Sequence, residues 1–194
     1  DLFRALELGG TLPLVRLAHG NLKEVKDALD AGAGGIIIPM IETPEQLSEV
    51  IQQACWPPEG KRGVGFSRAN LYGKYFSEYS EEARKTLVIA QIEHVNAVNN
   101  IDKILQVPGL DAIIIGPYDL SASMNLTGEF SHPEFKNALS MILQACVQLN
   151  KAAGVHIVTP DPAELQKRIN EGYQFIAYSI DSVFLHKSVV NPLN

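Results

Sequence analysis

Six short apolar runs, rich in β-branched residues, recur along this 194-residue chain and are separated by segments with helical character. The runs occupy residues 12–17, 35–40, 87–93, 112–117, 153–158 and 175–181. Continuous apolar runs of this length are typical of strands buried on both faces, and the helical segments supply crossovers between parallel strands. The pattern predicts an α/β fold with a parallel sheet, either open and doubly wound or closed as a (β/α) barrel.

Signals for helix ends support this alternation. Asn21 is a candidate N-cap for a helix that stops near Gly32, and Thr43, Pro44 and Gln46 have the spacing of a capping box with proline at the first helical position. We therefore expect helices at 21–32, 43–54, 95–106, 133–150, 161–172 and 182–190, with 1–10 forming the end of a further helix.

The barrel is the favoured architecture. No GxGxxG sequence follows the first run, so a dinucleotide-binding sheet has no support. We expect a (β/α)8 TIM-barrel type fold whose first one or two β/α units are absent from this chain, with residues 1–194 as a single partial barrel domain. Residues 55–80, rich in Gly, Pro and aromatic side chains, interrupt the alternation and are expected as a long loop that covers a site or an interface.

Composition narrows the classes of partner. The formal net charge of −6 argues against affinity for nucleic acid. No apolar run approaches the roughly 20 residues of a transmembrane helix, and the chain begins without a signal-peptide pattern. Cys55 and Cys146 form no CxxC pair, which fits a reducing compartment. We expect a cytoplasmic protein that does not associate with membranes.

Two carboxylates follow neighbouring apolar runs. Glu93 ends the run at 87–93, and Asp119 lies 26 positions later, just past the run at 112–117. This separation equals one strand–helix–strand unit, so we expect both side chains at the rim formed by the carboxyl ends of the strands. Adjacent strands are about 4.8 Å apart, and two such carboxylates suit a hard cation, Mg²⁺ or Mn²⁺. The alternative is that each acid caps the helix that follows it.

Three more polar residues are expected in or near this rim. Arg16 ends the run at 12–17 and needs an anionic partner, which is either a carboxylate ligand or a structural aspartate. Gln91 shares the face of Glu93 because side chains alternate along a strand, so it lines the site or fills the barrel. His156 is first a core histidine, and otherwise a ligand or an acid–base group.

The turn at 116–119 is a candidate binding site for an anion, whereas the positions of the lysines argue against a Schiff-base mechanism. The amides of Tyr118 and Asp119, after Gly116-Pro117, are candidates for an anion-binding helix start. No lysine falls within any of the six runs, whereas Schiff-base aldolases need a desolvated lysine inside the barrel. Carbon–carbon bond chemistry in this chain would therefore rely on a metal as electron sink.

Several segments resemble the HpcH/HpaI family of class II 2-oxo-acid aldolases. They are PLVR (13–16), IPMIETPEQ (38–46), PPEGKRGVG (57–65), QIE (91–93), VPGLDAIIIGPYDLSASM (107–124) and TPD (159–161). The resemblance extends from about residue 11 to 185, and GPYDLSASM after QIE is its most specific part. It implies a (β/α)8 barrel with a divalent metal, Mg²⁺ or Mn²⁺, held by Glu93 and Asp119.

The resemblance also implies roles for other residues. Arg16 would contact the 2-oxo oxygen, and Gln91 would line the pyruvate pocket. The amides of Tyr118 and Asp119 would hold the pyruvate carboxylate. Asp30, in ALDAGA, would correspond to the aspartate that one subunit donates to the catalytic histidine of its neighbour.

This sequence departs from the family pattern in one respect. Family members have an earlier strand that ends in a D-x-E-H-like motif, whose histidine is the base, and no such segment occurs here. Either the chain is a piece of a longer protein, which we favour, or another group serves as base. Because the family exchanges a C-terminal helix between barrels, the resemblance implies a homo-oligomer, a trimer or a hexamer.

The sequence thus predicts a lyase that reversibly cleaves a 4-hydroxy-2-oxo acid into pyruvate and an aldehyde. One alternative is another enolpyruvate-type lyase or decarboxylase on the same scaffold. The other, from a different class, is a catalytically inactive oligomeric homologue.

Overall fold

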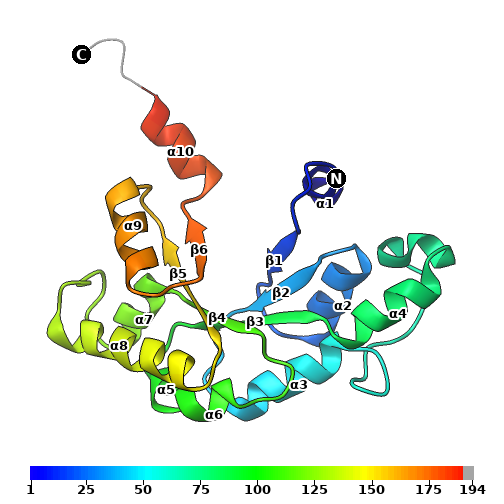
Figure 1. Cartoon of the computed structure of the whole chain (residues 1–194), viewed down its shortest axis with the longest axis horizontal. Coiled ribbons are helices and arrows are strands. Elements are labelled where there is room, and N and C mark those ends of the chain that lie inside the picture. The colour runs from blue at the N-terminus through cyan, green and yellow to red at the C-terminus, as the bar shows by residue number, and fades with distance from the viewer. Residues whose placement is uncertain (190–194) are drawn as a thin grey trace.

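A single six-stranded sheet organises the molecule (Figure 1). The computed structural model describes residues 1–189. The strands are β1 (Leu14–Arg16), β2 (Gly35–Ile38), β3 (Leu87–Ile92), β4 (Ala112–Ile115), β5 (Ala152–Ile157) and β6 (Phe175–Tyr178). They lie in sequence order, and each pairs in parallel with the next. The predicted parallel α/β fold is confirmed, and the six strands curl into a half-barrel. The closed eight-stranded barrel stays a prediction.

The helices that connect the strands lie around the outside of the curled sheet, whereas the last helix extends away from it (Figure 1). They are α1 (Leu2–Leu8), α2 (Leu22–Asp30), α3 (Pro44–Ala54), the 3₁₀ segment η1 (Arg68–Gly73), α4 (Phe76–Arg84), α5 (Val95–Asn99), α6 (Ile101–Leu105), α7 (Pro117–Ser123), α8 (Pro133–Gln148), α9 (Pro162–Asn170) and α10 (Asp181–Ser188). Among residues 1–189, no helix combines the length and the apolar character that a membrane crossing requires.

The two faces of the sheet have separate apolar clusters. Val88, Ala90 and Ile92 of β3 belong to the large core between the sheet and the helices. Ile89, between them, belongs to a smaller cluster on the concave face, together with Ala112 and Ile114 of β4. Since side chains alternate along a strand, this assignment places Gln91 and Glu93 on the concave face, inside the half-barrel.

The predicted helix caps at the first two crossovers are confirmed. The Asn21 side chain accepts a hydrogen bond from the Glu24 amide at the start of α2. At α3, Thr43 and Gln46 form a reciprocal capping box, with Pro44 in the first turn. The buried side of α3 then packs Leu47 and neighbouring apolar residues into the main core.

Two boundary predictions were wrong. The helix expected at 95–106 is divided into α5 and α6 by Asn100, which has φ −105° and ψ 9° and caps both. The loop expected at 55–80 contains η1 and most of α4, because Trp56 is buried and packs against Phe76 and Tyr79. The last helix ends at Ser188, and Val190 of the predicted segment lies outside the described residues.

We expect Thr43→Ala to lower the free energy of unfolding by about 1 kcal/mol, because the substitution leaves the first-turn amides of α3 without their side-chain acceptor. Urea denaturation measures the effect. Ser48→Ala, in the middle of the same helix, is the control and should change the stability by less than about 0.5 kcal/mol. Equal effects of the two substitutions would show that the capping box does not stabilise α3.

Candidate active site

The site lies where the carboxyl ends of β3 and β4 meet on the concave face. Ile92 pairs with Ile115 in the ladder, so the next residues, Glu93 and Gly116, are side by side at the rim. The amide of Gly116 donates to the Ile92 carbonyl, which keeps the strands together up to this point. The sheet register therefore brings the end of β3 against the start of α7, which carries Asp119 in its first turn.

Glu93 is held in place from two directions. Its side chain is buried, with 3% exposed. The Met40 amide donates to Oε1 at 2.8 Å, and the Gln91 side-chain amide donates to Oε2. Met40 directs its N–H at the carboxylate from a left-handed conformation with φ 53°, which is unfavourable for a residue other than glycine. Met40, just after β2, thus adopts an unfavourable backbone conformation that orients the Glu93 carboxylate.

Gly116 provides the space for that carboxylate. A Cβ at this position would lie 2.7 Å from Oε2 of Glu93 and 3.0 Å from the side-chain nitrogen of Gln91. Any larger residue would have to displace the Glu93–Gln91 pair. The glycine is therefore required by close approach of the neighbouring side chains, and not by its backbone angles, since its φ is −93°.

Asp119 places a second carboxyl group beside Glu93. Burial raises the pKa of Glu93, and the neighbouring Asp119 carboxyl raises it further, whereas the hydrogen bonds from Met40 and Gln91 act in the opposite direction. Two adjacent carboxylates repel one another unless a cation or a proton lies between them. Asp119 itself is exposed at the rim, so its side chain remains accessible to a ligand.

The donor set fits a hard divalent cation. Within residues 1–189, none of the ion pairs involves Glu93 or Asp119. In the same range, no group of three or more His, Cys, Asp and Glu side chains is arranged to hold a metal. Mg²⁺ commonly binds proteins through only one or two carboxylates and completes its octahedron with water or substrate. Glu93 and Asp119 match that requirement.

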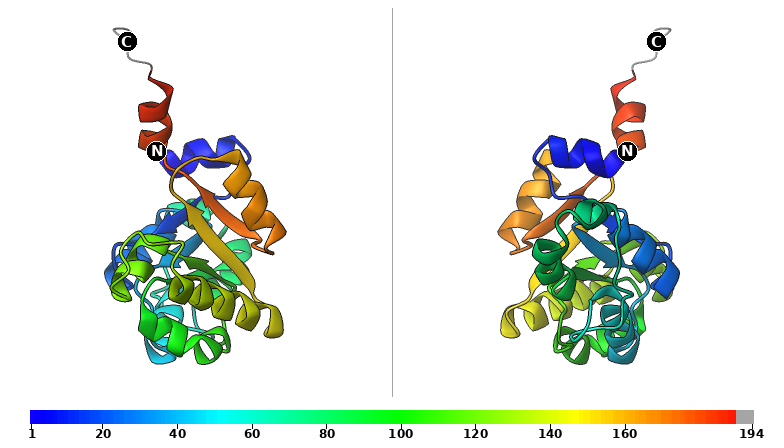
Figure 2. Two further views of the ribbon diagram at one scale, coloured as in Figure 1. Left: turned by 90° about the vertical axis from the view of Figure 1, so that its left-hand side faces the viewer. Right: turned by 90° about the vertical axis from the view of Figure 1, so that its right-hand side faces the viewer.

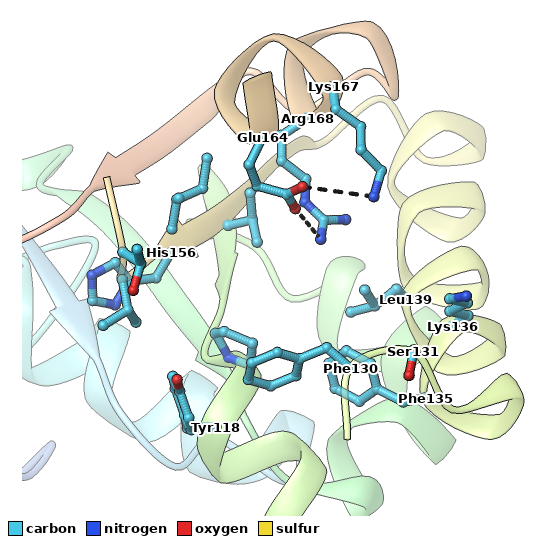
Figure 3. Close-up of a pocket in the computed structure, with 15 residues that line it drawn as sticks. Tyr118, Phe130, Ser131, Phe135, Lys136, Leu139, His156, Glu164, Lys167 and Arg168 are labelled. Carbon is cyan, nitrogen blue, oxygen red and sulfur yellow. Dashed lines mark ion pairs between the residues drawn. The ribbon is translucent and has the colours of Figure 1, made fainter. Parts of the chain in front are cut away.

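The start of α7 adds backbone donors next to the carboxylates. The first main-chain bond of this helix runs from the Leu120 amide to the Gly116 carbonyl, so the amides of Tyr118 and Asp119 precede the helical ladder. The Tyr118 ring packs edge-on against Phe130, with 4.9 Å between the ring centroids. It lines a pocket of about 440 Å³ between α7, α8 and α9 (Figure 3).

Arg16 lies at the end of β1 and is exposed. Leu14, two residues earlier, packs on the concave cluster, so Arg16 shares the concave face with Glu93. Its Nη1 donates to the Leu17 carbonyl at 3.1 Å, and no carboxylate pairs with it in the part of the chain that the structure describes. The guanidinium is thus available to an anionic or carbonyl oxygen.

Asp30 is not brought into this site. It is the last residue of α2, a helix that runs from the carboxyl end of β1 back to the start of β2. Asp30 therefore lies at the opposite end of the sheet from Glu93. There its carboxylate contacts Lys26 Nζ at 2.5 Å and lies 4.0 Å from Nη1 of the buried Arg62. The 55–80 segment packs at this same end, where Arg68 reaches the Ala31 carbonyl.

Met40 and Gly116 lie at strand ends, inside the segments IPMIETPEQ and VPGLDAIIIGPYDLSASM, but the sequence did not predict that they position Glu93. Their roles depend on contacts between different strands, namely the amide–carboxylate bond of Met40 and the missing side chain of Gly116. Neither contact leaves a local sequence signal.

Comparisons with known proteins agree with the fold and identify the family. The profile of the family described as HpcH/HpaI aldolase/citrate lyase matches residues 1–192. A hydroxypyruvate/pyruvate aldolase of Roseobacter denitrificans is 34% identical over 187 residues, which cover 95% of this chain and 72% of the relative. A 2-keto-3-deoxy-L-rhamnonate aldolase of Salmonella gallinarum is 37% identical over 186 residues, covering 93% of this chain and 68% of the relative.

Solved structures give the same result. An HpcH/HpaI aldolase/citrate lyase family protein from Burkholderia cenocepacia J2315 superimposes with a TM-score of 0.89 at 32% identity, over 96% of this chain and 74% of that chain. An HpcH/HpaI aldolase from Desulfitobacterium hafniense DCB-2 gives a TM-score of 0.85 at 31% identity, over 96% and 72% of the two chains. The six-stranded half-barrel therefore corresponds to the larger part of these relatives.

We expect Gly116→Ala to weaken the binding of Mn²⁺ by tenfold or more, on the order of other substitutions that misplace a metal ligand, because the new methyl group would lie only 2.7 Å from Glu93 Oε2 and displace it. Titration followed by electron paramagnetic resonance measures the affinity. Gly65→Ala is the matched control, since its Cβ would meet no atom within 4 Å. Unchanged affinity in Gly116→Ala would contradict the role of this close approach.

Proposed function

The chain belongs to the HpcH/HpaI aldolase/citrate lyase family and is a carbon–carbon lyase, and from this premise we propose that it is a divalent-metal-dependent aldolase that reversibly cleaves a 4-hydroxy-2-oxo acid into a pyruvate-type 2-oxo acid and an aldehyde. The observation that carries the proposal is the buried Glu93 carboxylate beside Asp119, at a rim that also has Arg16 and free helix-start amides.

Glu93 and Asp119 would hold the cation, either Mg²⁺ or Mn²⁺. The Met40 amide and the Gln91 side chain keep Glu93 oriented toward the concave face, so the ligand needs little reorganisation when the cation binds. When bound, such a cation supplies Lewis acidity at the carboxylate and ketone oxygens of a 2-oxo acid. The fit rests on the donor chemistry, since within residues 1–189 neither carboxylate is paired with a cationic side chain.

The residues of this chain also suit the substrate itself. The unengaged amides of Tyr118 and Asp119 are donors for the carboxylate of a 2-oxo acid. The exposed guanidinium of Arg16 would donate to the 2-oxo oxygen, where negative charge develops as the C3–C4 bond breaks and its electron pair passes to the enolate. Gln91 lines the concave face beside Glu93, next to the bound acid.

The proton on the 4-hydroxyl must also leave during cleavage, and Asp30 would assist that transfer in a neighbouring subunit. Its position at the far end of the sheet supports a role outside its own site, because it cannot reach Glu93 within the chain. Lys26 and Arg62 lie against the Asp30 carboxylate and limit its rotation. We propose a homo-oligomer, a trimer or a hexamer, in which Asp30 faces the site of the next subunit.

The lysines favour the metal mechanism over a Schiff-base mechanism. Strands β1 to β6 contain no lysine. The two lysines nearest to strands lie at their amino ends, and Lys151 donates to the Leu110 carbonyl there, away from the rim. A nucleophilic lysine requires a desolvated position inside the barrel.

Substitution of Glu93 by Ala is expected to lower kcat/KM for pyruvate release by at least about a hundredfold, because the cation then loses its buried ligand. Removing divalent cations with EDTA should abolish activity, and Mg²⁺ or Mn²⁺ should restore it. Glu134→Ala, an exposed carboxylate at the start of α8, is the control. Coupled assays for pyruvate, aldehyde and CO₂ identify the reaction.

Three outcomes would contradict parts of this proposal. Full activity of Glu93→Ala or of the EDTA-treated enzyme would exclude the metal role. Release of CO₂ without an aldehyde would identify a decarboxylase on the same scaffold. An inactive, cation-free wild-type protein would favour an oligomeric homologue without catalysis.

Helix α10 offers a test of the oligomer. It extends away from the sheet (Figure 2) and exposes 45% of Phe184 and 68% of Leu185. We expect Leu185→Asp to shift the protein toward smaller species in light scattering, because the charge would be buried against another subunit. Val147→Asp on α8, which is 74% exposed, is the control. An unchanged mass for Leu185→Asp would contradict an interface at α10.

A further inference from the structure

Arg62 is a charged side chain that the fold buries completely. None of its surface is exposed. Its backbone is anchored to the end of α3, since the Arg62 amide donates to the Cys55 carbonyl at 2.9 Å. Burial of a cation is costly unless a counter-charge and hydrogen bonds compensate for the lost water. The groups around this guanidinium therefore decide what its charge does.

Two aromatic rings hold the guanidinium in one place. Its central carbon lies 5.7 Å from the centroid of the Trp56 ring and 5.8 Å from that of the Tyr79 ring, within the range of a cation–π contact. Nη2 also donates to the Tyr79 hydroxyl at 3.1 Å. Nε and Nη1 are shielded from solvent and have no hydrogen-bond partner within residues 1–189. The charge is thus fixed in position but only partly satisfied.

Asp30 is the carboxylate that this cation faces. Among the ion pairs of residues 1–189, Arg62 takes part in one, in which its Nη1 lies 4.0 Å from Oδ1 of Asp30. That separation is too long for a hydrogen bond, so Arg62 attracts the carboxylate without occupying Oδ1. The other oxygen, Oδ2, accepts from Lys26 Nζ at 2.5 Å. Oδ1 is therefore left as an acceptor on a side chain that is 26% exposed.

The two cations differ in how firmly they hold the carboxylate. The Lys26 side chain is 41% exposed, has a flexible stem and makes a second, long contact of 3.4 Å with the Gly63 carbonyl. Arg62 is held by the rings of Trp56 and Tyr79, and salt screens a buried charge much less than an exposed one. Arg62 is thus the fixed charge toward which Oδ1 of Asp30 turns.

On the basis of the proposed function, in which Asp30 assists proton transfer in the neighbouring subunit, we propose that Arg62 is the positioning residue for that aspartate. Its guanidinium attracts Oδ1 from inside the subunit and keeps the carboxylate in one orientation, with Oδ1 open to a donor group of the next site. Trp56 and Tyr79 support this role, because they prevent Nη1 from closing the 4.0 Å gap and occupying Oδ1 itself.

The test combines Asp30→Asn with Arg62→Met, which removes the charge but keeps a long side chain. We expect Arg62→Met to lower kcat for pyruvate release by about tenfold or more. KM and the affinity for Mn²⁺ should stay at wild-type values, because Glu93 lies at the opposite end of the sheet. In Asp30→Asn, the added Arg62→Met substitution should lower kcat no further, since the residue that it positions is already lost.

Lys23→Met is the control for loss of a cation beside α2. Lys23 pairs with Asp27 on the exposed side of this helix. This substitution should leave kcat unchanged, because an exposed ion pair contributes little and neither residue contacts Asp30 in the described part of the chain.

Mixed oligomers, made by co-expression of two differently tagged variants, separate positioning from a structural role. With Glu93→Ala and Arg62→Met, one chain supplies an intact Asp30 and the other an intact Glu93, so activity should return. With Asp30→Asn and Arg62→Met, every donated aspartate is defective, and activity should not exceed that of the Arg62→Met oligomer. A structural defect in Arg62→Met would instead damage its own site, and Glu93→Ala subunits could not restore it.

A wild-type kcat in Arg62→Met, or mixed oligomers with Glu93→Ala that stay inactive, would overturn the proposal. If Arg62→Met does not fold, Arg62→Lys replaces it. Lysine keeps the charge but lacks the planar group that stacks on the rings, so we expect an intermediate kcat, and a wild-type kcat would overturn the proposal equally. Failure of the proposed function would look different, because wild type itself would then release no pyruvate, and this role of Arg62 would be excluded with it.

Discussion

Two hydrogen bonds and one close approach fix the Glu93 carboxylate at the rim of the sheet, and they involve three neighbouring strands. The Met40 amide comes from the end of β2, the Gln91 side chain from β3, and the space that the carboxylate occupies exists because Gly116 follows β4. A buried carboxylate is costly unless it is hydrogen-bonded and neutralised. Here the hydrogen bonds are present, and the neighbouring Asp119 increases the need for a cation. This arrangement is the basis of the proposed cation site.

The strand register that forms this site also determines on which face of the sheet the other polar residues lie. Arg16, Gln91 and His156 face the concave side, while their neighbours in the strands pack into the core with the helices. Asp30 is excluded because a crossover helix returns to the opposite end of the sheet. One chain therefore supplies the proposed metal site at one end and an aspartate at the other, an arrangement that suits an assembly in which subunits complete each other's sites.

Much of this could be predicted from the sequence because the decisive signals are local. The six strands, the α3 capping box and the spacing of Glu93 and Asp119 follow from apolar runs and cap residues within short windows. The break at Asn100 and the helix within 55–80 were missed, because backbone angles at one residue and the packing of Trp56 decide them. The roles of Met40, Gly116 and Arg62 depend on contacts between separate elements, which only the folded chain brings together.

The central claim, that Glu93 and Asp119 jointly hold a divalent cation, is tested most directly by anomalous diffraction from crystals grown with Mn²⁺ and oxalate, an analogue of the pyruvate enolate. We expect one strong manganese peak at the rim, about 2.0–2.2 Å from oxygens of both carboxylates, with oxalate in the adjacent positions. A peak bound elsewhere on the chain, or no peak between Glu93 and Asp119 at saturating Mn²⁺, would contradict it.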